Sequence, residues 1–189
     1  MEEGWGADYQ KGVNAYHKND YVTALTEWKP LAQQGDVDAQ LMVGQLYHRG
    51  LGVRQNLRTA MNWYSAAALR GQSDAAYSLG MLLADRQDYR GAHTWWLIAS
   101  SQGQPDAQND LGVMYDNGYG VKRDYVLAYM WFDVAASQGD QESTRNRDDV
   151  AKRMSAAQIN QAKKLSSECI SKKYQGCQVG FLSWGQPRR

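Results

Sequence analysis

Polar, small and aromatic residues recur along this chain at spacings that do not change. Four times, an Asp or Asn is followed by Ala after four residues, by an aromatic residue after four more, and by Gly after a further seven. The four sets are Asp20-Ala24-Trp28-Gly35, Asn56-Ala60-Tyr64-Gly71, Asp88-Ala92-Trp96-Gly103 and Asp124-Ala128-Phe132-Gly139. Asp and Asn cap the start of a helix and Gly stands just past its end, so each set predicts one helix of about four turns. Self-similarity at a fixed period predicts a stack of repeated helical units.

A second series of small residues predicts another helix in front of each set. This series consists of Gly12, Ala39-Gly44, Ala75-Gly80 and Ala107-Gly112. A glycine inside a helix costs roughly 1 kcal/mol relative to alanine, so its recurrence predicts a close approach of the partner helix. Aromatic residues fill the space beside these small residues, and we expect most of them in the core: Trp28, Trp63, Tyr64, Trp95, Trp96, Trp131 and Phe132.

The spacing of the repeat-ending glycines sets the organisation of the chain. Successive glycines lie 36, 32 and 36 residues apart, because the second and fourth repeats carry four extra residues in loops 49–53 and 117–121. These Gly-x-Gly-Val loops follow no strand, and we interpret them as turns rather than phosphate loops. We expect one domain over residues 1–179, with repeats at about 7–35, 36–71, 72–103 and 104–139. A cap at about 140–179 and a tail at 180–189 follow.

The periodic pattern ends after Gly139. Ser143 stands where the repeat has Ala, and Asp148 where it has Gly. These polar replacements suit a capping helix, because a terminal repeat needs a polar outer face. The segment Ser155-Ala-Ala-Gln158 is typical of a capping box and predicts a last helix through about Ser171.

The repeat residues resemble those of the Sel-1-like repeat family, a branch of the tetratricopeptide-like solenoids. The second and fourth repeats look like full members: Ala-Gln, Gly and Tyr are followed by Gly-x-Gly-Val and then by the Asp/Asn-Ala-Trp-Gly series. The first and third repeats, with the shorter loop, look more like plain tetratricopeptide repeats. The resemblance implies an all-α right-handed superhelix of antiparallel helix pairs. It also implies adaptor work of the kind known from bacterial envelope and secreted proteins, signalling scaffolds and quality-control complexes.

In tetratricopeptide-like folds the first helix of each repeat lines a concave groove, which suits an extended or helical peptide. By register, the residues expected on this surface are Tyr9, Val13, Tyr16, His17, Leu41, Gln45, His48, Arg49, Tyr77, Ser78, Met81, Asp85, Asn109, Asp110, Val113, Asp116 and Asn117. We therefore expect the groove to be aromatic at the first repeat and acidic at the fourth. The alternative for each of these residues is that it belongs to ordinary solvated surface without a partner.

Charge is distributed unevenly along the chain. The net charge of +1 argues against a general nucleic-acid binder. Residues up to Val150 carry a net charge of −6, whereas those from Ala151 onward carry +7. Two interpretations are open: a basic C-terminal end that contacts an anionic surface, or a solvated cap helix whose lysines suit a helix C-terminus.

The two cysteines bear on the cellular compartment. On one continuous helix Cys169 and Cys177 would lie about 12 Å apart, too far for a disulfide. However, Tyr174-Gln175-Gly176 predicts a helix stop, where the chain can fold back and allow a disulfide. A bridge would point to a periplasmic or secreted protein whose signal peptide, absent from this chain, has been removed. Two reduced thiols in a cytoplasmic protein are the alternative.

Other functions receive little support from the sequence. It contains no nucleophile elbow and no His-Glu-x-x-His motif, so we expect no enzyme and no cofactor, and a hydrolase-like activity is the remote alternative. A metal site is not expected, since His17, His48 and His93 belong to three different repeats. No run of 18 apolar residues predicts a membrane span. The apolar tail 180–189 fits either an interaction segment or docking on its own solenoid.

Overall fold

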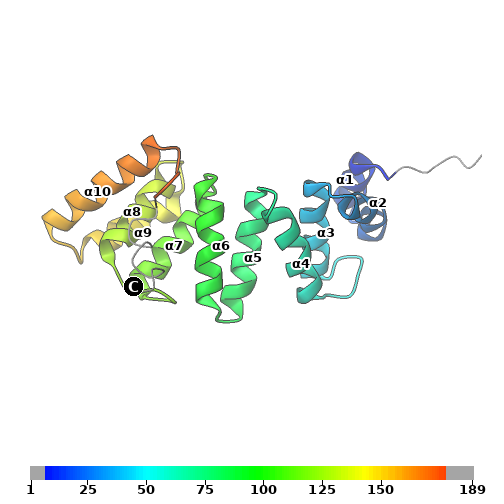
Figure 1. Ribbon diagram of the computed structural model, residues 1–189, viewed down its shortest axis with the longest axis horizontal. Helices are drawn as coiled ribbons and strands as arrows, with labels where there is room; N and C mark the ends of the chain where they lie inside the picture. Colours follow the sequence, from blue (N-terminus) through cyan, green and yellow to red (C-terminus); the bar gives the residue numbers. More distant parts are fainter. Residues whose placement is uncertain (1–6, 178–189) are drawn as a thin grey trace, which may run out of the picture. The chain divides into compact units, whose positions relative to one another are not determined.

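The computed structural model describes residues 7–177, where ten α-helices and no strands are found (Figure 1). The helices are α1 (Tyr9–His17), α2 (Tyr21–Gln33), α3 (Val37–Arg49), α4 (Leu57–Ala68), α5 (Ser73–Asp85), α6 (Tyr89–Ser101), α7 (Pro105–Asn117), α8 (Tyr125–Ala136), α9 (Gln141–Ala151) and α10 (Ala156–Ser171). The chain forms two compact units, Met1–Leu82 and Leu83–Arg189, with the boundary near the end of α5. The 180–189 tail lies outside the described residues.

The helix boundaries lie where the repeat pattern predicts them. The side chains of Asp20, Asn56, Asp88 and Asp124 each accept a backbone N–H in the first turn of α2, α4, α6 and α8. The four repeat-ending glycines have φ between 87° and 95°, a left-handed conformation that a residue with a Cβ adopts only at a cost. The last helix, α10, begins after the predicted capping box of Ser155 and Gln158.

The glycines inside the first helices are in close contact with the aromatic rings of their partner helices. A Cβ placed on Gly44 would lie 2.7 Å from the Tyr64 ring, and one on Gly112 would lie 2.5 Å from Phe132. The same addition at Gly12 would overlap the Trp28 indole. The predicted close approach is therefore confirmed at these three positions.

Most of the repeat aromatics are buried, as the pattern predicts. Trp28, Tyr64, Trp96, Trp131 and Phe132 lie in the core, whereas Trp63 and Trp95 are half-buried. Burial of such a ring removes on the order of 150–250 Å² from water. These side chains therefore supply much of the apolar contact between the paired helices.

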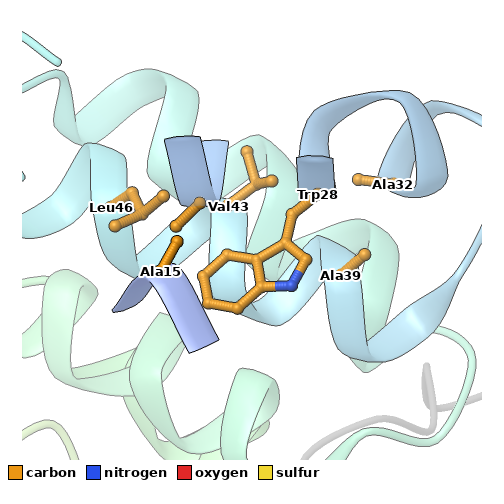
Figure 2. Packing of buried hydrophobic residues seen from close by; sticks show 7 residues of the cluster. Ala15, Trp28, Ala32, Ala39, Val43 and Leu46 are labelled. Atoms are coloured by element: carbon orange, nitrogen blue, oxygen red, sulfur yellow. The ribbon is translucent and has the colours of Figure 1, made fainter. Parts of the chain in front are cut away.

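The core of the first unit is built around one tryptophan. Figure 2 shows the Trp28 indole with Ala15 of α1 and with Val43 and Leu46 of α3 near it. The indole N–H donates to the carbonyl oxygen of Tyr9 at 3.1 Å. The side chain is fully buried, and its single polar group is satisfied.

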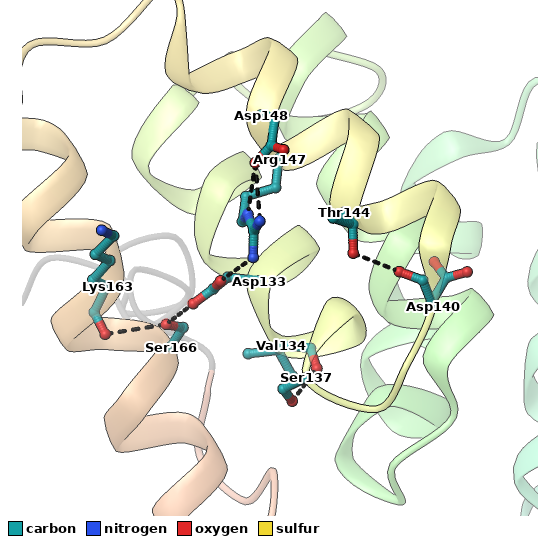
Figure 3. A network of polar contacts seen from close by, with 9 residues as sticks. All are labelled: Asp133, Val134, Ser137, Asp140, Thr144, Arg147, Asp148, Lys163 and Ser166. Carbon is teal, nitrogen blue, oxygen red and sulfur yellow. Dashed lines mark hydrogen bonds and ion pairs between the residues drawn. The ribbon is translucent and has the colours of Figure 1, made fainter.

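A polar network holds the last two helices of the second unit to α8 (Figure 3). The Asp133 carboxylate accepts from Arg147 of α9 at 3.1 Å and from the Ser166 hydroxyl of α10 at 2.6 Å. Arg147 also donates to Asp148 at 2.9 Å. One carboxylate of the last repeat therefore fixes both helices of the cap. At the position of the repeat Ala, Ser143 is buried in α9.

The chain folds back after α10, and of the two alternatives that the sequence left open for its cysteines, the disulfide is present. Cys169 and Cys177 are bridged, with their Cα atoms 5.0 Å apart. The reversal uses left-handed backbone at Lys173, Tyr174 and Gly176. We call residues 172–177 the C-terminal hook. The helix stop that the sequence predicts at Tyr174-Gln175-Gly176 makes this reversal.

Candidate partner-binding surface

The first unit carries the aromatic and basic part of the predicted groove. The expected side chains come from α1, α3 and the first ten residues of α5. His17, Arg49 and Met81 are exposed, the last by 39%. Most of the others are half-buried: Tyr9, Val13, Tyr16, Gln45, His48, Tyr77 and Ser78.

One residue of the expected set does not belong to this surface. Leu41 is only 8% exposed and is part of the core. Repeat register alone places it beside Gln45, but a leucine at this position packs against its neighbours rather than facing solvent. The prediction that Leu41 is available to a partner is therefore wrong.

Arg49 at the end of α3 forms a hydrogen bond with Tyr16 near the end of α1. Its guanidinium donates to the Tyr16 hydroxyl at 3.2 Å. Within residues 7–177 Arg49 forms no ion pair. The Tyr16 ring packs against Trp28, with ring centroids 5.8 Å apart. This tyrosine therefore links the exposed cation to the core.

A second polar link leads from the surface into the α3–α4 pair. The Nδ1 atom of His48 lies 3.3 Å from the Tyr64 hydroxyl oxygen. Burial raises the pKa of Tyr64 to about 12, although the Ser78 hydrogen bond and the Arg49 charge oppose this rise. Tyr64 therefore stays a neutral phenol at physiological pH. Burial likewise raises the pKa of Tyr9 at the other end of α1, and the nearby carboxylates of Asp38 and Asp36 add to this effect.

The second unit presents a different surface, because α9 engages the predicted residues of α7. The Asn109 side-chain oxygen accepts from Ser143 and from Asn146, both at 3.0 Å. Asp116 forms an ion pair with Arg153 at 2.7 Å. The acidic end expected at the fourth repeat is therefore neutralised at Asp116.

The remaining predicted residues of the second unit vary in exposure. Asn117 donates back to the carbonyl of Val113 in its own helix at 3.0 Å. Val113 is half-buried against the α8–α10 core, Asp110 is half-buried and Asp85 is exposed.

Sequence reasoning missed the cap residues that meet α7. Arg153 lies just after α9, outside every repeat, and its guanidinium also covers the Tyr125 ring at 4.7 Å from the centroid. Arg153 belongs to the basic segment that starts at Ala151, and this was the only signal for it in the sequence. Charge alone gave no indication that Asp116 would be its partner.

One titratable group of the second unit is deeply buried. His93 is buried on α6 with its Nε2 atom 3.0 Å from the Tyr115 hydroxyl oxygen, and burial lowers its pKa to about 4. The described part of the chain gathers no group of three or more His, Cys, Asp or Glu side chains as metal ligands. None of the helices within residues 7–177 has the length and apolar content needed to span a membrane.

Comparison with known proteins identifies the repeat type. The sequence profile of the Sel1 repeat matches residues 37–72, 73–104 and 105–140. The match at 73–104 corrects one expectation, because this third repeat looked more like a plain tetratricopeptide repeat. Its shorter loop is therefore a variation within the Sel1 pattern. The search found no matching protein among the curated proteins.

Two solved structures resemble this chain. A Sel1 repeat protein from Oxalobacter formigenes is 36% identical, with a TM-score of 0.59, and the alignment covers 66% of this chain and 97% of that one. A protective antigen present in uropathogenic Escherichia coli strains, which displays an SLR fold, is 25% identical with a TM-score of 0.51. That alignment covers 96% of this chain and 48% of the antigen, so this chain spans about half of its length. The repeat matches, the all-α solenoid fold and the shared identity together show that this chain belongs to the Sel1 repeat family.

Proposed function

We propose that this protein is a non-catalytic scaffold that binds a protein or peptide through the exposed side of its first helices. Sel1 repeats typically serve as protein-interaction scaffolds. The observation that carries the proposal is the cluster at the ends of α1 and α3. There, exposed Arg49 donates to the Tyr16 hydroxyl and forms no ion pair within residues 7–177, and exposed His17 is the last residue of the helix that carries Tyr16.

The protonation state of one buried side chain in each unit favours a scaffold over an enzyme. Tyr64 is held as a phenol and His93 as a neutral imidazole, because burial disfavours the charged form of each. A general acid or base works best with a pKa near the working pH. These two groups therefore serve the packing of the repeats rather than proton transfer.

A periplasmic or secreted location is part of this proposal. The Cys169–Cys177 bridge supports it, because disulfides persist in oxidising compartments. The protective antigen among the structural relatives, a protein of a bacterial pathogen, is compatible with the cell envelope. A thiol titration on the protein isolated without reductant tests this location: no reactive thiol is expected, and two thiols per chain would support the cytoplasmic alternative.

The binding surface is tested with exposed residues only. A partner would first be captured by cross-linking in intact cells and purified, and its affinity for the full chain measured by calorimetry. The triple variant His17→Ala, Arg49→Ala, Met81→Ala should bind at least tenfold more weakly, because buried cations and apolar side chains dominate interface energies. Its melting temperature should stay unchanged.

A matched control lies on the second helices of the same unit. Val22, Lys29 and Arg58 are also exposed, and their triple alanine variant should bind as the parent does. Equal weakening by both variants, or none by the first, would reject the assigned surface.

Attachment to an anionic surface is a second candidate function. Lys163, Lys164, Lys172 and Lys173 are exposed at the C-terminal end. Glu168 lies 4.0 Å from one of them, Lys164. By contrast, Arg153 and Lys152 are already paired with Asp116 and Asp149. Binding to vesicles of anionic lipid, lost when the four lysines are replaced by Gln and absent with neutral lipid, would support this candidate.

A further inference from the structure

The C-terminal hook packs against one of the turns that end a repeat, the turn at Gly103. The Tyr174 ring lies against the turn between α6 and α7, where a Cβ added to Gly103 would be 3.1 Å from Cε2 of the ring. The adjacent Gln175 donates its side-chain amide to the carbonyl of Ser101 at 2.7 Å. A tyrosine ring over the glycine and an amide on the carbonyl two residues earlier thus form one contact, within the second unit.

The corresponding turn of the first unit is open. Gly71 has a φ of 92°, close to the 87° of Gly103, so the two turns share their backbone conformation. A Cβ added to Gly71 would have no neighbouring atom within 4 Å among the described residues. At the position of Ser101 stands Leu69, which is 75% exposed. Leu69 is the most exposed large apolar side chain in the described part of the chain.

This open turn borders a pocket of about 300 Å³ formed by the starts of α3 and α5. The pocket is lined by Val37, Asp38, Arg70, Gly71, Gln72 and Ser73. The Arg70 guanidinium donates to the carbonyl of Gly35, and the Gln72 amide donates to Asp38 at 3.2 Å.

The chemistry of the pocket suits a phenol. A guanidinium attracts the face of an aromatic ring, and a bare glycine lets a ring approach the backbone. The Asp38 carboxylate is an acceptor for a phenolic hydroxyl. Leu69 adds an exposed apolar side chain next to these groups.

We propose that the Gly71 turn is a second interaction site, which takes a tyrosine side chain from a protein partner in the way that the Gly103 turn takes Tyr174. The tyrosine ring covers Gly71 between Leu69 and Arg70, and a neighbouring amide side chain of the partner donates to the Leu69 carbonyl. None of the residues that line this pocket belongs to the predicted groove surface described above.

The hook and the three residues before it, which include its disulfide partner Cys169, provide the probe for this site. A disulfide-closed nonapeptide with the sequence of residues 169–177 and blocked ends would be titrated into the ¹⁵N-labelled full chain. We expect amide shift changes at Gly71, Gln72 and Ser73. The same peptide with alanine in place of its tyrosine keeps all its lysines, so its failure to produce these shifts would exclude simple charge attraction.

Variants on the protein side decide between this site and others. Arg70→Ala and Leu69→Ser change exposed side chains, and each should weaken peptide binding about fivefold, as the loss of one cation–π or apolar contact implies. Val22→Ser, a change at another exposed apolar residue (61%), should leave binding unchanged, and so should Arg49→Ala. No shift changes at millimolar peptide, or shifts confined to the C-terminal ends of α1 and α3 or to the Gly103 turn, would overturn the proposal.

Discussion

The α3–α4 and α7–α8 helix pairs have the same packing but different chemistry at their surfaces. In both, a helix glycine lies under an aromatic ring, Gly44 under Tyr64 and Gly112 under Phe132. At the positions that follow, the first pair has His48 and Arg49, whereas the second has Asp116 and Asn117. Asp116 is paired with Arg153 of the cap, and Asn109, further back on α7, accepts from Asn146 of α9. Arg49, by contrast, is hydrogen-bonded to the neutral Tyr16 hydroxyl and forms no ion pair within residues 7–177.

A buried glutamine side chain makes the same hydrogen bond in both units. Gln40 donates to the carbonyl of Ala32 at 3.1 Å, and Gln108 donates to that of Ser100 at 3.2 Å. Each bond ties a first helix to the end of the helix before it. The repeated residues therefore specify the contacts inside and between helix pairs. A few positions that are not repeated decide which part of the surface remains exposed to a partner.

The largest effect should come from removing the buried ring in either pair. Tyr64→Ala and Phe132→Ala should each lower the free energy of unfolding by about 3–5 kcal/mol, because both leave a cavity over a glycine. Urea denaturation followed by circular dichroism measures this loss. Val22→Ala, at an exposed position, should change stability by less than about 0.5 kcal/mol. A small loss of stability for only one of the two variants would show that the two helix pairs do not share this packing.

A pH dependence should separate the second unit from the first. The pKa of His93 is about 4 in the folded protein and near 6.5 when unfolded. Between these values the unfolded chain binds a proton that the folded chain excludes, so stability falls as the pH falls. The gap corresponds to about 3 kcal/mol by pH 4.

Replacement of the imidazole tests this prediction. The corresponding residue of α4 is Met61, so His93→Met should flatten the stability profile between pH 7 and 4.5. His17→Met, which changes an exposed histidine, should leave the slope as in the parent. A profile that stays unchanged in His93→Met would assign the pH dependence to other groups.

The hydroxyl that distinguishes Tyr64 from Phe132 should have a moderate effect. Tyr64→Phe should cost about 1 kcal/mol, since it removes a hydroxyl bonded to His48. A double-mutant cycle with His48→Ala should reveal a coupling of about 0.5–1 kcal/mol. The corresponding cycle of Phe132→Leu with Asp116→Ala should show no coupling, and equal coupling in both pairs would contradict the distinction.

The smallest effect should be at the exposed cations. Arg153→Ala should cost about 1 kcal/mol or less, because it removes an exposed ion pair and a contact with the Tyr125 ring. Half-molar salt should reduce this loss, since screening weakens exposed pairs. Arg49→Ala, in contrast, should leave the melting temperature unchanged. A clear loss of stability in Arg49→Ala would mean that this residue serves the fold rather than a partner.

Much of the fold was predictable, because its information is local and repeated. An Asp20 or an Asp124 caps the helix that follows it whatever lies further away, and Gly35 ends a helix by its own backbone freedom. The helix stop at Tyr174-Gln175-Gly176 was predictable for a similar reason, and it made a disulfide with Cys169 feasible, but only the structure decided that the two cysteines are bridged. The burial of Leu41 was not, because its neighbours come from other helices.

The sequence by itself determined the repeat, the boundaries of its helices, the close packing of glycine against aromatic rings, and membership of a scaffold family. Only the tertiary structure decided that Asp116 is neutralised by Arg153, that Asp133 holds two cap helices, and that Tyr174 covers Gly103 while Gly71 stays open. The physical reason is the range of the interactions. Caps and helix periodicity act within a few residues. The contacts of Asp133 and Asp116, by contrast, join side chains 14 to 37 positions apart, and Tyr174 lies 71 positions after Gly103 in the sequence.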